Sequence, residues 1–164
     1  MVKQMIRKAV QQDAEQIRKI YNWYVDNTVI TFEDEAISAL NMQKRMALAD
    51  DDHPWFVIEE QGVLVGFTYA APWKSRAAYE FSCETTVYIA KNYSGKGLGR
   101  KLYQRLIDEL RESPIHLLVA GIALPNDASV ALHEKLGFRK VAHFNEVGFK
   151  FGKFIDVGYW QLTI

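Results

Sequence analysis

A glycine-rich segment, residues 93–100 with the sequence YSGKGLGR, is the feature of this chain that most limits its fold. It lies between a strand-like run that ends at Tyr88-Ile89 and a helix-like run that begins near Leu98. Such a turn must bend sharply, bring bare backbone N–H groups together and leave no Cβ in front of them. A glycine turn that leads into a helix is a physical device for holding phosphate. The segment therefore predicts a strand–turn–helix unit that binds a phosphate-bearing ligand.

Composition favours one ordinary domain over residues 1–164. The chain is 49% hydrophobic and 13% aromatic, so it can bury a substantial core and is not expected to be disordered. Its formal net charge is +0 at pH 7, which argues against a nucleic-acid partner. We expect a cytoplasmic protein with no membrane partner, because the sequence has neither a signal pattern nor a long apolar span. Cys83, the single cysteine, allows no intrachain disulfide and is expected to be buried.

Hydrophobic spacing predicts a mixed α/β order of elements in a single domain. Leu102, Leu106 and Leu110 are spaced as on one face of a helix. Residues 117–124 instead form a nearly continuous apolar strand, of the kind that is buried on both faces. The expected helices are 13–26, capped by Asp13, 38–49, capped by Ser38, 98–112 and 126–136, and the expected strands are 5–10, 56–59, 63–71, 79–90, 117–124, 138–146 and 154–162.

Three phosphate-binding turns compete for the glycine run. A P-loop needs a longer glycine spacing closed by Lys-Ser or Lys-Thr, and residues 95–99 (GKGLG) lack that pair. A dinucleotide fingerprint needs its third glycine one residue later and a carboxylate at the end of the following strand, which residues 117–124 do not supply. The remaining device is the pyrophosphate loop of acetyl-coenzyme A enzymes. The run alone is weak evidence, and a surface turn without a ligand stays the alternative.

Longer stretches resemble the GCN5-related N-acetyltransferase (GNAT) superfamily. Residues 94–99 (SGKGLG) correspond to its Q/R-x-x-G-x-G/A loop, and residues 126–129 (NDAS) and 132–138 (LHEKLGF) look like its second cofactor helix. Ser94 stands where the family usually has Gln or Arg, and Phe154 where its phosphinothricin and methionine-sulfone acetyltransferase branch commonly has Trp. That branch is the nearest in sequence. Its matching segments, in order over nearly the whole chain, are 31–33 (TFE), 72–76 (PWKSR), 84–88 (ETTVY), 124–127 (LPND), 148–150 (GFK) and 156–161 (DVGYWQ).

The resemblance implies a GNAT fold, with a central mixed, mostly antiparallel twisted sheet of about seven strands and helices on both faces. It also implies one N-acetyltransferase domain over residues 1–164, acetyl-CoA as cosubstrate and no metal. Core packing, capping and surface solvation stay as structural alternatives for individual side chains. The implied cofactor-binding residues are Val87, Tyr88 and Ile89, with an N–H of Tyr88 or Val87 facing the thioester oxygen, Gly95, Lys96, Gly97, Leu98, Gly99 and Arg100 at the pyrophosphate, and Asn126 and Ser129.

The implied reaction is direct attack of a primary amine on the acetyl thioester, and two residues are candidates for proton transfer. Glu84 is the candidate general base, through a water, because partial burial in an apolar strand would raise its proton affinity. It could instead face solvent or only orient the amine. His133 is the candidate acid for the departing thiolate, since histidine can do this near neutral pH. The alternative is a partly buried histidine bonded to a carbonyl.

The branch implies small acceptors such as phosphinothricin, methionine sulfoximine and methionine sulfone. Lys74 and Arg76 could clamp the acceptor carboxylate, since arginine can make a bidentate contact. Phe32 and Tyr79 could line the side-chain pocket, while Glu33 could contact the substrate or cap a helix. The branch also implies a homodimer, for which the aromatic residues of the last strands offer a surface, with packing inside one chain as the alternative. These aromatics are Phe149, Phe151, Phe154, Tyr159 and Trp160.

Two other functions fit part of the pattern. A protein N-terminus or a polyamine could replace the amino acid as acceptor, although the cations of residues 74–76 argue mildly against a polyamine. A non-catalytic acyl-CoA sensor would keep the glycine turn at 95–99 but would need neither Glu84 nor His133. No cluster of histidines and carboxylates has convincing metal-ligand spacing.

Overall fold

The computed structural model describes residues 3–164, which form one seven-stranded sheet in the order β1-β2-β3-β4-β5-β7-β6. Neighbouring strands are antiparallel except β4 and β5, which are parallel. The expected mixed, mostly antiparallel sheet of seven strands is confirmed. The strands are β1 (Gln4–Lys8), β2 (Trp55–Glu60), β3 (Val63–Pro72), β4 (Ser82–Ile89), β5 (Leu117–Leu124), β6 (Arg139–Lys150) and β7 (Lys153–Thr163), and the α-helices are α1 (Ala14–Asn27), α2 (Ala39–Met46), α3 (Leu98–Arg111) and α4 (Asp127–Lys135).

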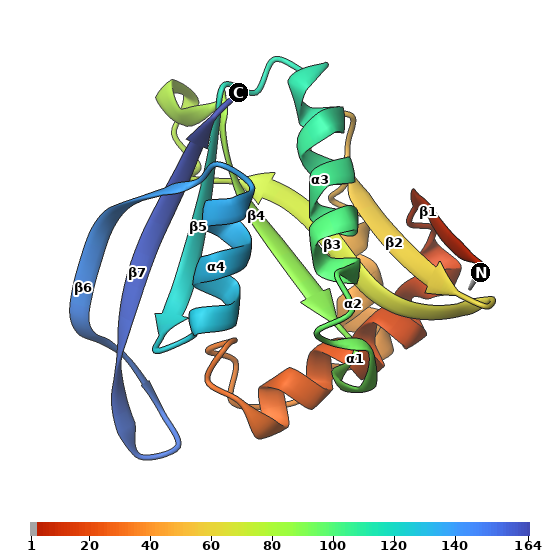
Figure 1. Cartoon of the computed structure of the whole chain (residues 1–164), viewed down its shortest axis with the longest axis horizontal. Coiled ribbons are helices and arrows are strands. Elements are labelled where there is room, and N and C mark those ends of the chain that lie inside the picture. The colour runs from red at the N-terminus through yellow and green to blue at the C-terminus, as the bar shows by residue number, and fades with distance from the viewer. Residues whose placement is uncertain (1–2) are drawn as a thin grey trace.

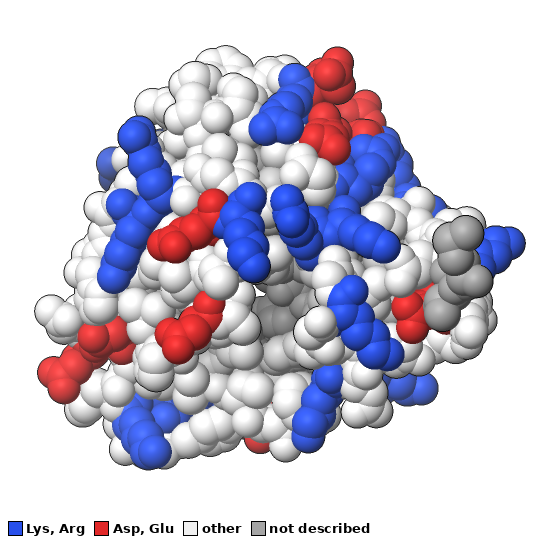
Figure 2. Space-filling view, in the orientation of Figure 1, with Lys and Arg blue, Asp and Glu red and all other residues white. Residues whose placement is uncertain are grey.

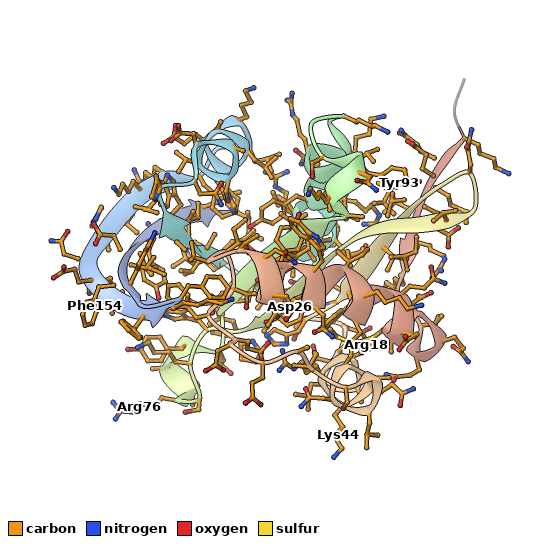
Figure 3. All side chains as sticks on the ribbon, turned by 90° about the horizontal axis from the view of Figure 1, so that it is seen from below. Arg18, Asp26, Lys44, Arg76, Tyr93 and Phe154 are labelled. Carbon is orange, nitrogen blue, oxygen red and sulfur yellow. The ribbon has the colours of Figure 1, made fainter. Side chains whose placement is uncertain are left out.

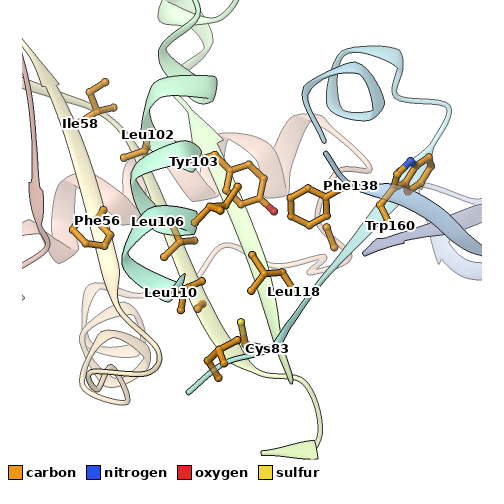
Figure 4. Packing of buried hydrophobic residues seen from close by; sticks show 14 of the residues in the cluster. Phe56, Ile58, Cys83, Leu102, Tyr103, Leu106, Leu110, Leu118, Phe138 and Trp160 are labelled. Carbon is orange, nitrogen blue, oxygen red and sulfur yellow. The ribbon is translucent and has the colours of Figure 1, made fainter. Parts of the chain in front are cut away.

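Helices cover both faces of the sheet, as expected (Figure 1). The alternation of side chains along β2 explains why: Phe56 and Ile58 pack in a core beneath α3, whereas Val57 packs on the opposite face with α1 and α2. Figure 4 shows how the first core joins the two halves of the sheet, since Tyr103 of α3 lies beside Phe138. The two cores hold the central strands rigidly, so the site between them is built on fixed elements.

Strands β4 and β5 separate after a short pairing, and this divergence creates the site. They are paired only over residues 82–84 and 117–119. Beyond that point β4 stays with β3 as far as Ile89, and β5 stays with β7 as far as Leu124. The exposed edge of β4 therefore faces the region between α3 and α4.

Several expected boundaries are wrong, and those of β4 and β6 have a local reason. Strand β4 begins at Ser82, because residues 77–79 form a 3-10 turn in which the N–H of Tyr79 bonds the Arg76 carbonyl at 2.9 Å. Strand β6 runs to Lys150 because bulges between Phe144 and Gly148 interrupt its alternation without ending it. Helix α2 ends at Met46 rather than near residue 49.

Asp13 is the N-cap residue of α1, as expected, but its side chain makes no capping bond. The Asp13 carboxylate instead accepts the N–H of Val10 at 2.8 Å and pairs with Arg7 at 2.7 Å, so it holds the chain before α1. Ser38 does cap α2, because its hydroxyl oxygen accepts the N–H of Asn41 at 3.1 Å. Cys83 is buried and free.

Candidate active site

A cleft with a volume of about 600 Å³ lies between the free edge of β4 and the helices α3 and α4. Figure 2 shows a hollow on this face of the molecule, with Lys and Arg side chains around it. All but one of the eleven cofactor-binding residues expected from the sequence line the cleft. They are Val87, Tyr88, Ile89, Gly95, Gly97, Leu98, Gly99, Arg100, Asn126 and Ser129.

The glycine turn presents unpaired backbone donors to this cleft. Gly95 and Gly97 both adopt a φ of 78°, which residues other than glycine rarely adopt. A Cβ at either residue would meet nothing within 4 Å. Within residues 3–164, the N–H groups of residues 95–100 have no backbone partner, and the first helical bond at this end joins the Lys101 N–H to the Gly97 carbonyl. The turn therefore has the open, donor-rich geometry that an anion needs at a helix N-terminus.

The edge of β4 supplies two further donors. The N–H of Ala90 bonds the Val65 carbonyl on β3 at 2.8 Å, and successive peptide groups along a strand point in opposite directions. The N–H groups of Ile89 and Val87 therefore point away from β3, toward the side that β5 has left. Of the two donors that the sequence left open, Val87 rather than Tyr88 faces the cleft. The register of β3 and β4 is continuous here, so divergence and not a bulge frees these groups.

The start of α4 completes the cleft. The side-chain oxygen of Asn126 accepts the N–H of Ser129 at 3.2 Å, so Asn126 caps this helix. Both residues also line the cleft. Capping and a place in the cleft are therefore compatible for this pair.

A second cavity, of about 440 Å³, adjoins the cleft and contains Glu84. Ile30, Val87, Tyr88 and Ser129 line both cavities, so the two form one continuous site. No group within residues 3–164 bonds the Glu84 carboxylate, and burial raises its pKa above the ordinary value of 4.5. An unpaired, half-buried carboxylate of this kind is a candidate proton acceptor.

His133 lies in the wall of the second cavity and is bonded on both ring nitrogens. Its Nδ1 is 2.7 Å from the Ser129 carbonyl and its Nε2 is 3.2 Å from the Tyr103 hydroxyl, which also bonds Thr85. Burial lowers the pKa of the imidazole, so the neutral ring donates from Nδ1 and accepts at Nε2. This geometry matches the alternative given for His133, a buried histidine bonded to a carbonyl.

The remaining predicted residues do not line the cofactor cleft. Phe32 lines the Glu84 cavity, but the Glu33 carboxylate is paired with Arg45 and accepts a hydrogen bond from the Tyr21 hydroxyl. Lys96 lies outside the cleft, with its Nζ 4.0 Å from Glu60 and 4.7 Å from the Tyr93 ring centroid.

The three residues of the loop between β3 and β4 that were expected at the acceptor do not line the Glu84 cavity. Lys74, Arg76 and Tyr79 line a separate cavity with Ser75, and Figure 3 shows Arg76 on the outside of this segment. The loop touches the wall of the Glu84 cavity through Trp73, whose ring centroid is 5.6 Å from that of Tyr159. A carboxylate clamp by Lys74 and Arg76 therefore stays a prediction.

Sequence reasoning missed the residues that reach the site from distant elements. Tyr24 and Ile30 come from α1 and the segment after it, and Lys135 from the end of α4. The hydroxyl of Tyr24 donates to the Ile89 carbonyl, which ties α1 to the edge of β4. Their spacing in the sequence gives no signal, since Tyr24 reads only as part of an apolar helix face. Further lining residues of this kind in the Glu84 cavity are Tyr21, Tyr69, Thr86, Gly121 and Tyr159.

No three His, Cys, Asp or Glu side chains in residues 3–164 are grouped so that they could hold a metal ion. No helix in the same range is long and apolar enough to cross a membrane.

The splayed strands, the unpaired amides and the buried carboxylate together define a class of protein. An extended phosphate-bearing cofactor can bind its phosphates at the start of α3 and run along β4, so that its reactive end meets a nucleophile beside Glu84. This is the arrangement of an enzyme that transfers a group from a nucleotide-linked carrier to a small acceptor.

Comparison with known proteins identifies the family. Residues 6–158 match the model of the acetyltransferase (GNAT) domain, and the chain belongs to this family. It is 36% identical over 156 residues to the phosphinothricin N-acetyltransferase of Streptomyces viridochromogenes, covering 95% of this chain and 85% of the relative. It is 38% identical over 163 residues to the L-methionine sulfoximine/L-methionine sulfone acetyltransferase of Salmonella typhimurium, covering 97% and 94%.

Solved structures agree. The Salmonella typhimurium acetyltransferase yncA, solved with its cofactor acetyl-CoA, superimposes with a TM-score of 0.92 at 37% identity, covering 98% of this chain and 93% of that one. These findings confirm the resemblance to the branch, the GNAT fold and the assignment as an acetyl-CoA-dependent N-acetyltransferase.

Proposed function

We propose that this enzyme acetylates the α-amine of a small amino acid of the phosphinothricin, methionine sulfoximine or methionine sulfone type. The observation that carries this proposal is the unpaired Glu84 carboxylate in a small cavity continuous with the cofactor cleft. The names of the relatives from Streptomyces viridochromogenes and Salmonella typhimurium support the acceptor class. A polyamine acceptor is less favoured, because Glu84 is the only carboxylate among residues 3–164 that lines the cavity.

The residues of the cleft fit acetyl-CoA, which supplies the activated acetyl thioester. The free N–H groups of residues 95–100 suit its pyrophosphate, and Arg100 adds a positive charge at the same rim. The outward N–H of Ile89 suits the amide-bearing arm, while that of Val87 is left for the thioester. Asn126 and Ser129 line the opposite wall, where they would hold the cofactor.

Glu84 accepts the proton that the amine must lose before or during attack, directly or through one water. Its burial raises its proton affinity toward the range in which a base is useful at neutral pH. The N–H of Val87 lies three residues further along β4 and stabilises negative charge on an acyl oxygen. Fixing both reactants beside each other supplies effective molarities of roughly 10⁵ M or more. Attack forms the C–N bond of the new amide and breaks the C–S bond of the thioester, so coenzyme A leaves as a thiolate that takes up a proton from water. These steps need neither the Lys74 and Arg76 clamp nor the acid role of His133.

The test is a thiol-release assay with purified enzyme, acetyl-CoA and a panel of amines. We expect turnover with methionine sulfone, methionine sulfoximine and phosphinothricin, and little with spermidine or a peptide that begins with alanine. Faster turnover of the peptide or of spermidine would transfer the assignment to a protein or polyamine acetyltransferase. Calorimetric binding of acetyl-CoA without thiol release from any amine would indicate an acyl-CoA sensor.

We also propose that the enzyme is a cytoplasmic homodimer that associates through the β6–β7 hairpin. Five large apolar side chains of this hairpin are 51% to 66% exposed. This is more exposed apolar surface than we expect for a hairpin that faces only solvent. Two of the expected aromatics are not among the five, because Trp160 is buried in the core and Tyr159 is half-buried in the wall of the Glu84 cavity. The five side chains, called the hairpin patch, are Phe144, Val147, Phe149, Phe151 and Phe154.

Light scattering coupled to gel filtration should give twice the chain mass of 18.9 kDa. Phe149 and Phe154 lie with ring centroids 5.0 Å apart, so changing both to serine removes the centre of the hairpin patch and should give monomers. A wild-type enzyme that elutes as a monomer at micromolar concentration contradicts this proposal.

A further inference from the structure

The segment 148–150 (GFK) of β6 contacts the chain that follows α1. Gly148 and Lys150 are buried and lie on one side of the strand, while Phe149 between them is exposed on the other. In Figure 1 the segment after α1 lies between that helix and the β6–β7 hairpin. Residues 30–32 of this segment, called the acceptor loop, form part of the wall of the Glu84 cavity.

The absence of a side chain at Gly148 leaves space for the Phe32 ring. A Cβ at Gly148 would lie 2.4 Å from both Cε2 and Cζ of Phe32, so any side chain there must displace the ring. Gly148 does not adopt a left-handed φ, and alanine would therefore cause no backbone strain. The glycine is needed for the space above it, and that space is filled by a ring that lines the acceptor cavity.

Lys150 holds the same loop from its other side. Its Nζ donates to the carbonyl of Val25, in the last turns of α1, at 2.7 Å and to the carbonyl of Thr31 at 2.8 Å. No carboxylate in the part of the chain that the structure describes lies within ion-pair distance of this buried ammonium. A buried charge is costly, and here its partners are two carbonyl oxygens, one of them in the acceptor loop.

The acceptor loop is therefore held firmly on both sides. Beyond Phe32, the Glu33 carboxylate is fixed by Arg45 and by the Tyr21 hydroxyl, which also bonds the Thr31 hydroxyl. Lys150 fixes the Thr31 backbone, and Gly148 leaves the space that the Phe32 ring, 42% exposed, occupies. The loop also reaches the cofactor cleft through Ile30, but only the Glu84 cavity contains Thr31 and Phe32.

We propose that Gly148 and Lys150 are positioning residues that set acceptor specificity by seating the acceptor loop against β6. The proposal rests on the proposed function, because it makes the Glu84 cavity the acceptor pocket. Neither residue lines that cavity; both act through Phe32 and Thr31. The size of the acceptor that fits is thus decided in part from the C-terminal hairpin.

A double-mutant cycle tests the part played by Gly148. Gly148→Ala should change kcat/KM for methionine sulfone by about tenfold, and change its ratio to a smaller amino acid, while the Kd for acetyl-CoA stays within about twofold. In a Phe32→Ala background the same change should have less than about a twofold effect, because the displaced ring is gone. Equal effects of Gly148→Ala in both backgrounds would overturn the proposal.

Hydrogen exchange tests the part played by Lys150 without any acceptor. Lys150→Met should speed amide exchange in residues 28–33 and raise the acceptor KM more than it lowers kcat. Lys153→Met is the matched control, because Lys153 faces Lys150 across the hairpin and is exposed. Equal exchange in the two variants would refute the seating by Lys150. A wild type that acetylates no amino acid would refute the proposed function instead, and exchange would still decide whether Lys150 seats the loop.

Discussion

Replacing Glu84 by glutamine is expected to lower kcat for amino-acid acetylation by about 100-fold or more, the range that general-base catalysis contributes. The amide keeps the shape of the carboxylate but cannot accept a proton. Acetyl-CoA binding should be unchanged, since Glu84 lines the second cavity and not the cofactor cleft. A fixed-time thiol-release assay measures kcat, and calorimetry measures the affinity for acetyl-CoA on the same preparation.

The pH dependence separates a base from a residue that only orients the amine. Burial raises the pKa of Glu84 above 4.5, so the acid limb of the wild-type rate profile should lie above the ordinary carboxylate range. In Glu84→Gln that limb should disappear, leaving only the ionisation of the amine itself. A variant with raised acceptor KM, unchanged kcat and an unchanged acid limb would show that Glu84 orients the amine. Glu80→Gln, at an exposed glutamate just before β4, is the control.

The stability of Glu84→Gln gives an independent test of whether the pKa of Glu84 is raised in the folded protein. Because the pKa of Glu84 is raised in the folded state, the folded protein binds this proton more tightly than the unfolded chain does. Stability is therefore lost as pH rises from about the unfolded value through the folded one. Glutamine cannot ionise, so Glu84→Gln should be at least as stable as wild type at pH 7 in urea unfolding. A clear loss of stability would mean that the carboxylate has a structural role.

Helix α3, the glycine turn and the cap of α2 could be predicted because the residues that determine each of them are close together in the sequence. Helix α3 follows from the apolar spacing of Leu102, Leu106 and Leu110, and the glycine turn before it from residues 95–99. The cap at Ser38 needs only one hydroxyl before an apolar-periodic run. Each of these depends on neighbours within about two turns of helix, which the sequence displays directly.

The rest depends on contacts between distant segments. The true length of β6 was hidden by bulges, because an extra residue reverses the alternation that identifies a strand. The sequence places Lys74 and Arg76 eight to ten residues before Glu84, yet the 3-10 turn at 77–79 carries them into another cavity. The cleft itself comes from the separation of β4 and β5, which no spacing in either strand encodes.

The features of the site also divide into those that the sequence could predict and those that depend on contacts between distant segments. The backbone donors of the glycine turn were predictable, since glycine and a helix start determine where N–H groups point. The bond of the His133 ring to Tyr103 was not predictable, because it requires α3 and α4 to pack side by side, whereas the bond to the Ser129 carbonyl lies within α4. Tyr21 and Tyr24 look like core positions of α1, and only the packed sheet brings them to the two cavities.

Replacing Gly97 by alanine is expected to weaken acetyl-CoA binding by about 10–100-fold, equivalent to losing one charge-assisted hydrogen bond. Gly97 adopts a φ of 78°, which costs an alanine about 1–2 kcal/mol. The turn can escape that cost only by rotating its peptide groups, which turns the unpaired N–H groups near the start of α3 away from the cleft. The free energy of unfolding should therefore fall by no more than about 1–2 kcal/mol, while the affinity loss is large.

Gly62→Ala is the matched control that isolates the phosphate-binding role. Gly62 has a φ of 81° and, like Gly97, open space where a Cβ would lie, but it is in the turn between β2 and β3, away from the cleft. Both variants should lose similar stability in urea unfolding, and only Gly97→Ala should lose affinity in calorimetric titration with acetyl-CoA. Equal affinity in all three proteins would mean that the amides at the start of α3 do not hold the pyrophosphate, because strain alone is matched between the two glycines.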